Sequence, residues 1–228
     1  MKTAIILAGG LGTRLKSVVQ DIPKPMAPVR GKPFVAYVLQ YLKMYGVERI
    51  IFSIGYKGEV VQEYFKKEYL SMQIDYAIEA TPLGTGGGIF QAAQMCGDEP
   101  FFVLNGDTMF DINLFELEDF YHKKNAEMVI ALKAMEKFDR YGVVEISETE
   151  RVTAFKEKEY KEKGLINGGT YFFSKKVFEG TNFPKRFSFE KDFMEKYLEK
   201  MQMFGCELDG FFLDIGIPED YARAEKEL

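Results

Sequence analysis

The residue types in this chain restrict the chemistry that it can perform. It contains one histidine, His122, and two cysteines, Cys96 and Cys206. His122 lies in a charged helical stretch, and the cysteines lack the spacing of metal ligands or redox pairs. Serine-histidine triads and zinc sites with histidine ligands are therefore excluded as the basis of catalysis. The chemistry must depend on carboxylates, lysine, arginine, backbone amides and a hard metal ion.

A glycine-rich loop follows the apolar run Thr3–Leu7, and residues 7–14 read Leu-Ala-Gly-Gly-Leu-Gly-Thr-Arg. Glycines allow backbone N–H groups to approach an anion closely, and the guanidinium of Arg14 can hold phosphate oxygens. Leu15 stands where a Rossmann fingerprint requires glycine, and Thr13-Arg14 stands where a Walker P-loop requires Gly-Lys. On the glycines alone, a structural turn and a phosphate-binding site are about equally well supported.

Lys24 lies between Pro23 and Pro25, a short distance after this loop. Proline fixes φ and biases the residue before it toward extended geometry, so the pattern predicts that Lys24 is held on a stiff, exposed segment. Residues 1–32 carry six lysines and arginines and one acidic residue, whereas the whole chain has a net charge of −5. This distribution predicts a site for a compact polyanion. It argues against a nucleic-acid-binding protein, whose surface would be strongly basic.

Two aspartates follow apolar runs that are predicted to be strands. Asp107 comes after residues 101–105, and Asp214 comes after residues 211–213. An aspartate after a strand often serves only as a turn residue or a helix N-cap. Ligands of parallel α/β sheets, however, collect beyond the carboxyl ends of the strands. The positions after Leu7, Asn105 and Leu213, and the region of Glu79, are therefore candidates for function.

The hydrophobic pattern predicts the scaffold that these residues need. Strand-like runs alternate with amphipathic helical stretches in the first half of the chain. The predicted strands are residues 3–7, 49–54, 74–79 and 101–105, and the predicted helices are residues 33–45, 59–67, 87–95 and 113–124. Such alternation specifies βαβ units and a largely parallel sheet that is covered by helices on both faces.

The second half of the chain is less regular. Strand-like runs at residues 128–133, 143–147 and 170–173 have few helices between them, and a helix at 188–201, a strand at 211–213 and a helix at 218–226 complete the pattern. We therefore predict the α/β class, with a three-layer α/β/α Rossmann-like fold around a mixed, mostly parallel central sheet. No linker or repeat divides the chain, so residues 1–228 are predicted to form a single domain.

The composition is that of a folded protein. Hydrophobic residues make up 46% of the chain and charged residues 29%. No apolar run approaches the roughly 18 residues that a membrane helix needs. We therefore expect a cytoplasmic protein that binds neither a membrane nor nucleic acid.

The order Leu-Ala-Gly-Gly-x-Gly-Thr-Arg, nine further residues and then Lys-Pro resembles the signature of the sugar nucleotidyltransferases, the sugar-1-phosphate pyrophosphorylases. The chain is similar to this family from end to end, including residues 79–86, 141–144, 155–158 and 166–169. The resemblance implies a nucleotidyltransferase fold and the Mg²⁺-dependent transfer of a nucleotidyl group from a nucleoside triphosphate to a sugar 1-phosphate, with release of pyrophosphate. The resemblance is also compatible with a homodimer.

The resemblance also implies roles for particular residues. Arg14, Lys24 and Asp107 would be catalytic, and Asp107 and Asp214 would bind Mg²⁺, for which hard oxygen ligands are suited. The residues implied to bind the nucleotide are Leu7, Ala8, Gly9, Gly10, Gly12, Thr13, Arg14, Lys24, Glu79, Pro82, Gly84 and Thr85. Those implied to bind the sugar phosphate are Gly142, Glu157, Lys158, Asn167 and Gly168. Taken alone, the alternating charges of residues 156–163 are typical of a solvated loop.

Glu79 bears on the choice of base. A carboxylate only accepts hydrogen bonds, which suits the N1–H and N2–H₂ donors of guanine. Uracil also offers one N–H group, so this argument favours guanine only mildly. Residues 16–29 most resemble family members that transfer GMP to a heptose 1-phosphate. Transfer of GMP to mannose 1-phosphate, or of UMP to N-acetylmuramate 1-phosphate, remains an alternative, and the expected partners are GTP and a sugar 1-phosphate.

Two other classes of protein share such a sheet. A nucleotide-sugar-dependent glycosyltransferase usually carries Asp-x-Asp at the metal-binding strand, and Gly106-Asp107-Thr108-Met109 lacks this pattern. A catalytically inactive regulatory relative would be expected to lack Arg14, Lys24 or one of the aspartates, and all of them are present. The sequence therefore favours an active nucleotidyltransferase.

Overall fold

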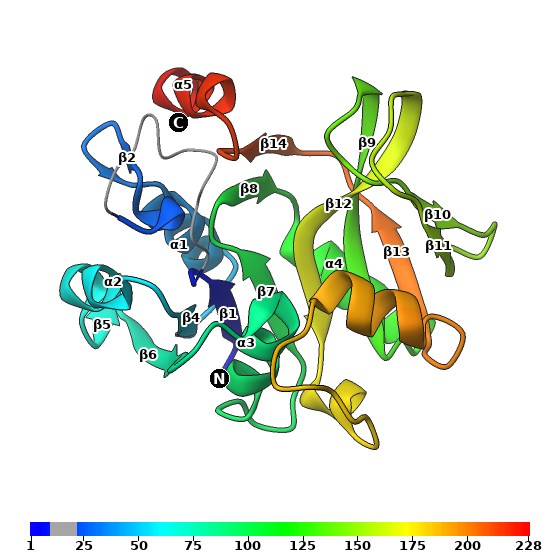
Figure 1. Ribbon diagram of the computed structural model, residues 1–228, viewed down its shortest axis with the longest axis horizontal. Helices are drawn as coiled ribbons and strands as arrows, with labels where there is room; N and C mark the ends of the chain where they lie inside the picture. Colours follow the sequence, from blue (N-terminus) through cyan, green and yellow to red (C-terminus); the bar gives the residue numbers. More distant parts are fainter. Residues whose placement is uncertain (10–21) are drawn as a thin grey trace.

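The computed structural model describes residues 1–9 and 22–228 and has an eight-stranded sheet at its centre, in the order β13-β9-β12-β7-β1-β4-β6-β5 (Figure 1). These strands are β1 (Thr3–Leu7), β4 (Arg49–Ile54), β5 (Glu68–Tyr69), β6 (Met72–Ile78), β7 (Phe101–Asn105), β9 (Met128–Phe138), β12 (Lys161–Phe173) and β13 (Met203–Glu207). Strands β7, β1, β4 and β6 run parallel, and so do β13 and β9. Strand β12 is antiparallel to both of its neighbours, and β5 is antiparallel to β6. The mixed, mostly parallel sheet is thus confirmed.

Both faces of the sheet are covered, which gives the predicted three layers. The adjacent side chains of Ile5 and Ile6 in β1 are fully buried, yet they belong to two different hydrophobic clusters. One cluster includes residues of α1 (Phe34–Met44), α2 (Gly58–Phe65), α4 (Leu114–Lys124) and α5 (Pro218–Glu227). The other includes residues of α3 (Gly84–Ala93) and of a π-helix (Phe189–Glu195).

The parallel half of the sheet agrees with the predicted elements, and only their ends shift. The predicted helix at 33–45 is α1, which follows Pro33 and ends shortly before Gly46, a residue with φ of +74°. Helix α2 ends earlier than predicted because Lys66 leaves the helical region, with φ of +54°. In the parallel half of the sheet, apolar runs predict strands reliably because these strands are buried on both faces.

The antiparallel half departs further from the prediction. Strand β12 has 13 residues, whereas the sequence pattern predicts a strand only at 170–173. The early part of β12 pairs with the far end of β9, for example Lys161 with Phe138. This part is charged and partly exposed, so it carries no hydrophobic pattern that marks a strand. The register of the pair shifts between Asn167 and Tyr171.

The sequence pattern also misses β8 (Thr108–Asp111) and the edge strand β13. Strand β14 (Phe211–Asp214) pairs antiparallel with β8 in a separate two-stranded sheet, with Asp214 opposite Thr108. The helix predicted at 188–201 is instead the π-helix, and helical structure ends at residue 197. The short elements are 3₁₀ turns at Lys24–Met26 and Lys175–Phe178, and the hairpins β2 (Pro28–Val29)/β3 (Lys32–Pro33) and β10 (Val144–Ile146)/β11 (Val152–Phe155). Within the described residues, no helix is long and apolar enough to cross a membrane.

Candidate active site

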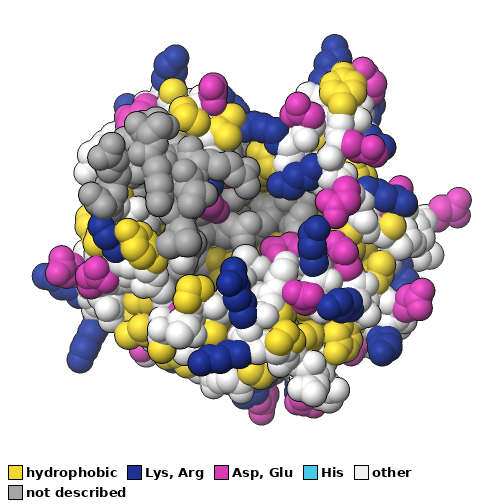
Figure 2. Space-filling view, in the orientation of Figure 1, with side chains coloured by type: hydrophobic (Ala, Val, Ile, Leu, Met, Phe, Trp, Pro, Cys, Tyr) yellow, Lys and Arg dark blue, Asp and Glu magenta, His cyan; other side chains and the backbone are white. Residues whose placement is uncertain are grey.

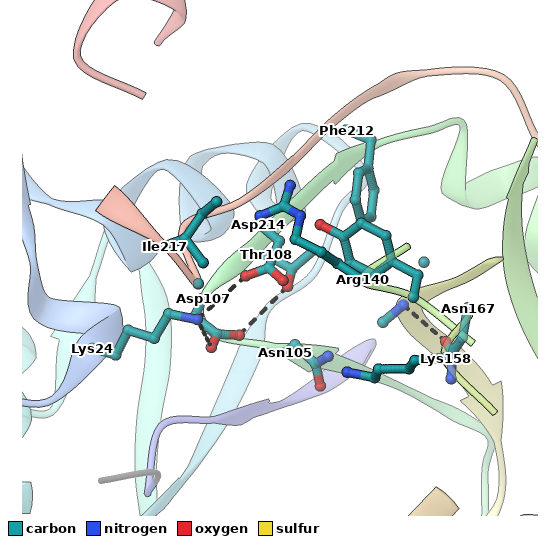
Figure 3. Close-up of a pocket in the computed structure, with 14 residues that line it drawn as sticks. Lys24, Asn105, Asp107, Thr108, Arg140, Lys158, Asn167, Phe212, Asp214 and Ile217 are labelled. Carbon is teal, nitrogen blue, oxygen red and sulfur yellow. Dashed lines mark hydrogen bonds and ion pairs between the residues drawn. The ribbon is translucent and has the colours of Figure 1, made fainter. Parts of the chain in front are cut away.

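Three charged residues from distant parts of the sequence meet beyond the carboxyl end of β7. Asp107 lies two residues after the end of β7, and Asp214 is brought beside it because β14 pairs with β8. The ammonium Nζ of Lys24 donates hydrogen bonds to Asp107 Oδ2 at 2.6 Å and to Asp214 Oδ1 at 3.3 Å (Figure 3). The structure thus joins the predicted catalytic lysine to both predicted metal ligands.

Lys24 is less exposed than its sequence context suggests. The expectation of an exposed, extended segment is wrong, because Pro23, Pro25 and Met26 are buried and Lys24 begins a 3₁₀ turn. Only 13% of the Lys24 side chain is accessible, since the two carboxylates attract the ammonium inward. Burial by itself lowers the pKa of Lys24, but the charges and hydrogen bonds of Asp107 and Asp214 outweigh it and raise the pKa overall. The ammonium therefore stays charged at neutral pH. Burial, and then the charge of Asp107, raise the pKa of Asp214, while Lys24 acts in the opposite direction.

A cavity of about 390 Å³ lies on one side of Lys24 and Asp107, at the carboxyl ends of the parallel strands. Of the predicted nucleotide-binding residues, those that line it are Leu7, Gly9, Lys24, Glu79, Pro82, Gly84 and Thr85. Ala8 is buried, and its N–H group donates to the carbonyl of Ser53. The predicted Gly10, Gly12, Thr13 and Arg14 lie outside the described residues. We refer to this space as the nucleotide-side cavity.

Glu79 is fixed in the wall of the nucleotide-side cavity. Its Oε2 accepts from the Leu83 N–H at 2.9 Å, and its Oε1 accepts from the Ser53 hydroxyl at 3.3 Å. Burial raises the pKa of the Glu79 carboxyl, and these two donors oppose the rise. A Cβ on Gly88 would lie 2.8 Å from Oε1 and 2.6 Å from the Ser53 hydroxyl, so glycine is needed at this position of α3. Each carboxylate oxygen retains a lone pair for a ligand.

Two adjoining cavities lie on the other side of Lys24 and Asp107. The first, of about 370 Å³, reaches Lys24, Asp107 and Asp214. The second, of about 230 Å³, extends toward the π-helix. The predicted sugar-phosphate residues Gly142, Glu157, Lys158, Asn167 and Gly168 each line one or both of them. We refer to these spaces together as the acceptor-side cavity.

The acceptor-side residues differ in how firmly they are held. The side-chain amide of Asn167 donates to the Tyr171 hydroxyl and accepts from the Gly169 N–H, each at 2.9 Å. Glu157 is exposed and pairs with Lys191 at 2.9 Å, and this hydrogen bond lowers the pKa of the Glu157 carboxyl. In the view of Figure 2, charged side chains of both signs gather at the rim of the central hollow, on the side of β12. The rim of this cavity is thus built from exposed charges.

Several lining residues have no place among the sequence-based predictions. Asn105 lines all three spaces, and Arg140, which pairs with Asp220 at 2.7 Å, lines the first acceptor space beside Tyr141. The sequence offered a signal for both, because Asn105 stands two residues before Asp107 and Arg140 directly precedes the family segment 141–144. Arg186 and Glu190 line the nucleotide-side cavity, and no motif or spacing marks them.

Asp107 and Asp214 suit a hard divalent cation. Magnesium is commonly held by one or two protein carboxylates, with substrate phosphates and water as the remaining ligands. Among residues 1–9 and 22–228, no group of three or more acidic, histidine or cysteine side chains is placed to hold a metal ion. The pair of carboxylates leaves coordination positions open for phosphate oxygens and water, which is the ligand set that Mg²⁺ takes at phosphate-binding sites.

Comparisons with known proteins agree with this geometry. A family profile described as "Nucleotidyl transferase" matches residues 3–228. The chain is 48% identical to a D-glycero-α-D-manno-heptose 1-phosphate guanylyltransferase of Campylobacter jejuni, over 96% of both chains, and 46% identical to one of Aneurinibacillus thermoaerophilus, over 99% of this chain and 97% of the relative. The crystal structure of HddC from Yersinia pseudotuberculosis complexed with GMP-PN superposes with a TM-score of 0.88 at 38% identity, covering 100% of this chain and 99% of that one.

Proposed function

Because the chain belongs to the nucleotidyl transferase family, we propose that it transfers GMP from GTP to D-glycero-α-D-manno-heptose 1-phosphate, producing GDP-D-glycero-α-D-manno-heptose and pyrophosphate. One observation carries the proposal. Lys24 and Asp107 line both the nucleotide-side and the acceptor-side cavity, so a phosphate in each would meet at these two residues. The family match favours nucleotidyl transfer over the glycosyltransferase alternative.

The reaction requires one in-line displacement. A phosphate oxygen of the heptose 1-phosphate attacks the α-phosphorus of GTP, a new P–O bond forms, and the bond from that phosphorus to the β-phosphate oxygen breaks to release pyrophosphate. The attacking phosphate is already an anion, so no histidine base is needed. Alignment of the two phosphates and neutralisation of their charge are the main requirements.

The protein residues supply alignment and charge. We assign to Lys24 the neutralisation of charge near the α-phosphate, since its ammonium lies where the two cavities meet. Lys158 and Arg140 would hold the acceptor phosphate, because both are cations in the wall of the acceptor-side cavity. Arg14 and the glycine amides of residues 9–12 are proposed to hold the β- and γ-phosphates, as the family resemblance implies.

We propose that Asp107 and Asp214 hold a Mg²⁺ ion. When bound, Mg²⁺ would withdraw charge from phosphate oxygens and favour departure of pyrophosphate. The two carboxylates would then exchange the ammonium of Lys24 for the metal, which frees Lys24 to contact phosphate. A cytoplasmic location and a homodimer remain predictions from the sequence.

A pyrophosphate-release assay tests the proposed function. GTP, UTP, ATP, CTP and dTTP are each combined with heptose 1-phosphate, mannose 1-phosphate and N-acetylmuramate 1-phosphate, with reactions lacking a sugar phosphate as controls. We expect the highest kcat/KM for GTP with the heptose 1-phosphate. A preference for UTP with N-acetylmuramate 1-phosphate, or for GTP with mannose 1-phosphate, would replace the proposal with that activity.

A further inference from the structure

Glu190 lies where the nucleotide-side and acceptor-side cavities adjoin. It lies near the start of the π-helix and is partly exposed. It lines the nucleotide-side cavity together with Thr85, and it lines the acceptor-side cavity together with Asn167 and Tyr171. The irregular turns of π-helices are often found at functional sites.

The position of Glu190 is fixed by contacts with the start of α3. Its Oε2 accepts hydrogen bonds from the hydroxyls of Thr85 and Ser188, each at 2.8 Å. The Phe189 N–H donates to the Thr85 hydroxyl at 2.9 Å, and the Gly86 N–H donates to the Phe187 carbonyl at 3.0 Å. A Cβ on Gly86 would lie 2.3 Å from the Phe187 ring, so the contact of α3 with the segment just before the π-helix depends on glycine. The carboxylate is thus held before substrate arrives.

One oxygen of this carboxylate is left for a ligand. Both hydrogen bonds of Glu190 within the described part of the chain involve Oε2. Glu190 also lines the acceptor-side space, so Oε1 is the oxygen that a ligand there could use. Four neighbouring side chains are already engaged, because Asn167 bonds to Tyr171 and Glu157 pairs with Lys191 at the rim.

We propose that Glu190 binds hydroxyl groups of the acceptor sugar through Oε1, and that its bond to Thr85 ties the acceptor site to the nucleotide-side loop. A carboxylate accepts hydrogen bonds and cannot donate them, and sugar hydroxyls are the donors available in the acceptor. The inference rests on the proposed function, since it assumes that the second cavity holds a sugar 1-phosphate. It adds a residue that contacts the sugar rather than the phosphate.

The test compares Glu190→Gln with Ser188→Ala as a matched control. The control removes one of the two donors to Oε2 and leaves the carboxylate in place. For Glu190→Gln we expect the KM for heptose 1-phosphate to rise about tenfold or more, because a hydrogen bond to a charged group is lost. The KM for GTP and the kcat at saturating acceptor should stay within about threefold of wild type, as for a contact made equally in ground and transition states. Ser188→Ala should change each constant by less than about threefold.

Equilibrium titration calorimetry supplies a readout independent of turnover. Glu190→Gln should weaken the binding of heptose 1-phosphate and leave the binding of inorganic phosphate unchanged or tighter, since one negative charge is removed and phosphate has no sugar hydroxyls. Equal effects of Glu190→Gln and Ser188→Ala would show that Glu190 only supports the fold. A change confined to the KM for GTP would show that Glu190 contacts the ribose of the nucleotide and not the acceptor sugar. Each of these two results would overturn the inference.

Failure of the proposed function gives a different result. In that case wild-type protein would not turn over heptose 1-phosphate, and the pyrophosphate assay would identify another sugar 1-phosphate. The ratio of binding constants between wild type and Glu190→Gln would then be measured with that compound. A ratio near one would overturn the role of Glu190, whatever the sugar.

Discussion

The two sides of the active site are built by different means. The nucleotide-side cavity is formed by the ends of parallel strands and by α3, and its Glu79 is fixed by a backbone N–H, a hydroxyl and the close approach of Gly88. The acceptor-side cavity is formed around β12, and Glu157 and Lys158 at its rim are exposed. Substitutions on the first side should therefore alter the choice of base, and those on the second should alter affinity for the sugar phosphate with little effect on stability.

The largest effect is expected where the two sides meet. Asp107→Ala and Asp214→Ala should each reduce Mg²⁺-dependent turnover by a factor on the order of 10³ or more, because charge neutralisation by a bound metal contributes several kcal/mol. Since the two carboxylates are proposed to share one ion, each substitution should also abolish Mn²⁺ binding, measured by electron paramagnetic resonance. Normal Mn²⁺ binding in either folded variant would remove that residue from the metal site.

Lys158→Ala tests the acceptor side. The KM for the sugar 1-phosphate should rise roughly 10- to 100-fold, because an ammonium that contacts phosphate is removed. The free energy of unfolding in urea should change by less than about 0.5 kcal/mol, since the side chain is exposed. Lys163→Ala is the control, because Lys163 is an exposed lysine that pairs with Glu136 and lines none of the cavities described above. Similar KM values for the two variants would contradict the phosphate role of Lys158.

Glu79→Gln tests the nucleotide side and has the smallest expected effect. Wild-type protein should prefer GTP over ATP by roughly tenfold or more in kcat/KM, because adenine turns an acceptor toward the carboxylate and leaves both unpaired. The variant should narrow this ratio, since a side-chain amide donates as well as accepts. If the GTP/ATP ratio is the same in both proteins, a group other than Glu79 reads the base.

The same division separates what could be predicted from the sequence from what could not. The strands and helices of the parallel half carry apolar patterns that burial on both faces imposes, so α1 and its neighbours were predictable. In the antiparallel half, the pairing of Lys161 with Phe138 joins residues without such a pattern, and the extent of β12 could not be read. The periodicity of apolar residues in the sequence reflects burial, so the pairing of exposed strand segments cannot be predicted from it.

The site shows a similar limit. Asp107 and Asp214 were expected together only because the motifs resemble a family, since the pairing of β14 with β8 links segments about a hundred residues apart in the chain. The ion pairs of Lys24 with both aspartates follow from that pairing and were not predicted. Glu190 and Arg186 lack a local motif, because their position depends on the hydrogen bonds of Phe187, which lies between them, to the start of α3.

The central claim is that Lys24 acts at the transferred phosphate, and the kinetics of Lys24→Ala test it most directly. The variant is compared with wild type and with Lys24→Arg, which keeps the charge, after circular dichroism has shown that all three are folded. We expect kcat for Lys24→Ala to fall by a factor on the order of 10²–10³ while the KM for GTP changes by only a few-fold, because the ammonium is needed chiefly where charge is redistributed. A kcat for Lys24→Ala within a few-fold of wild type would contradict the account.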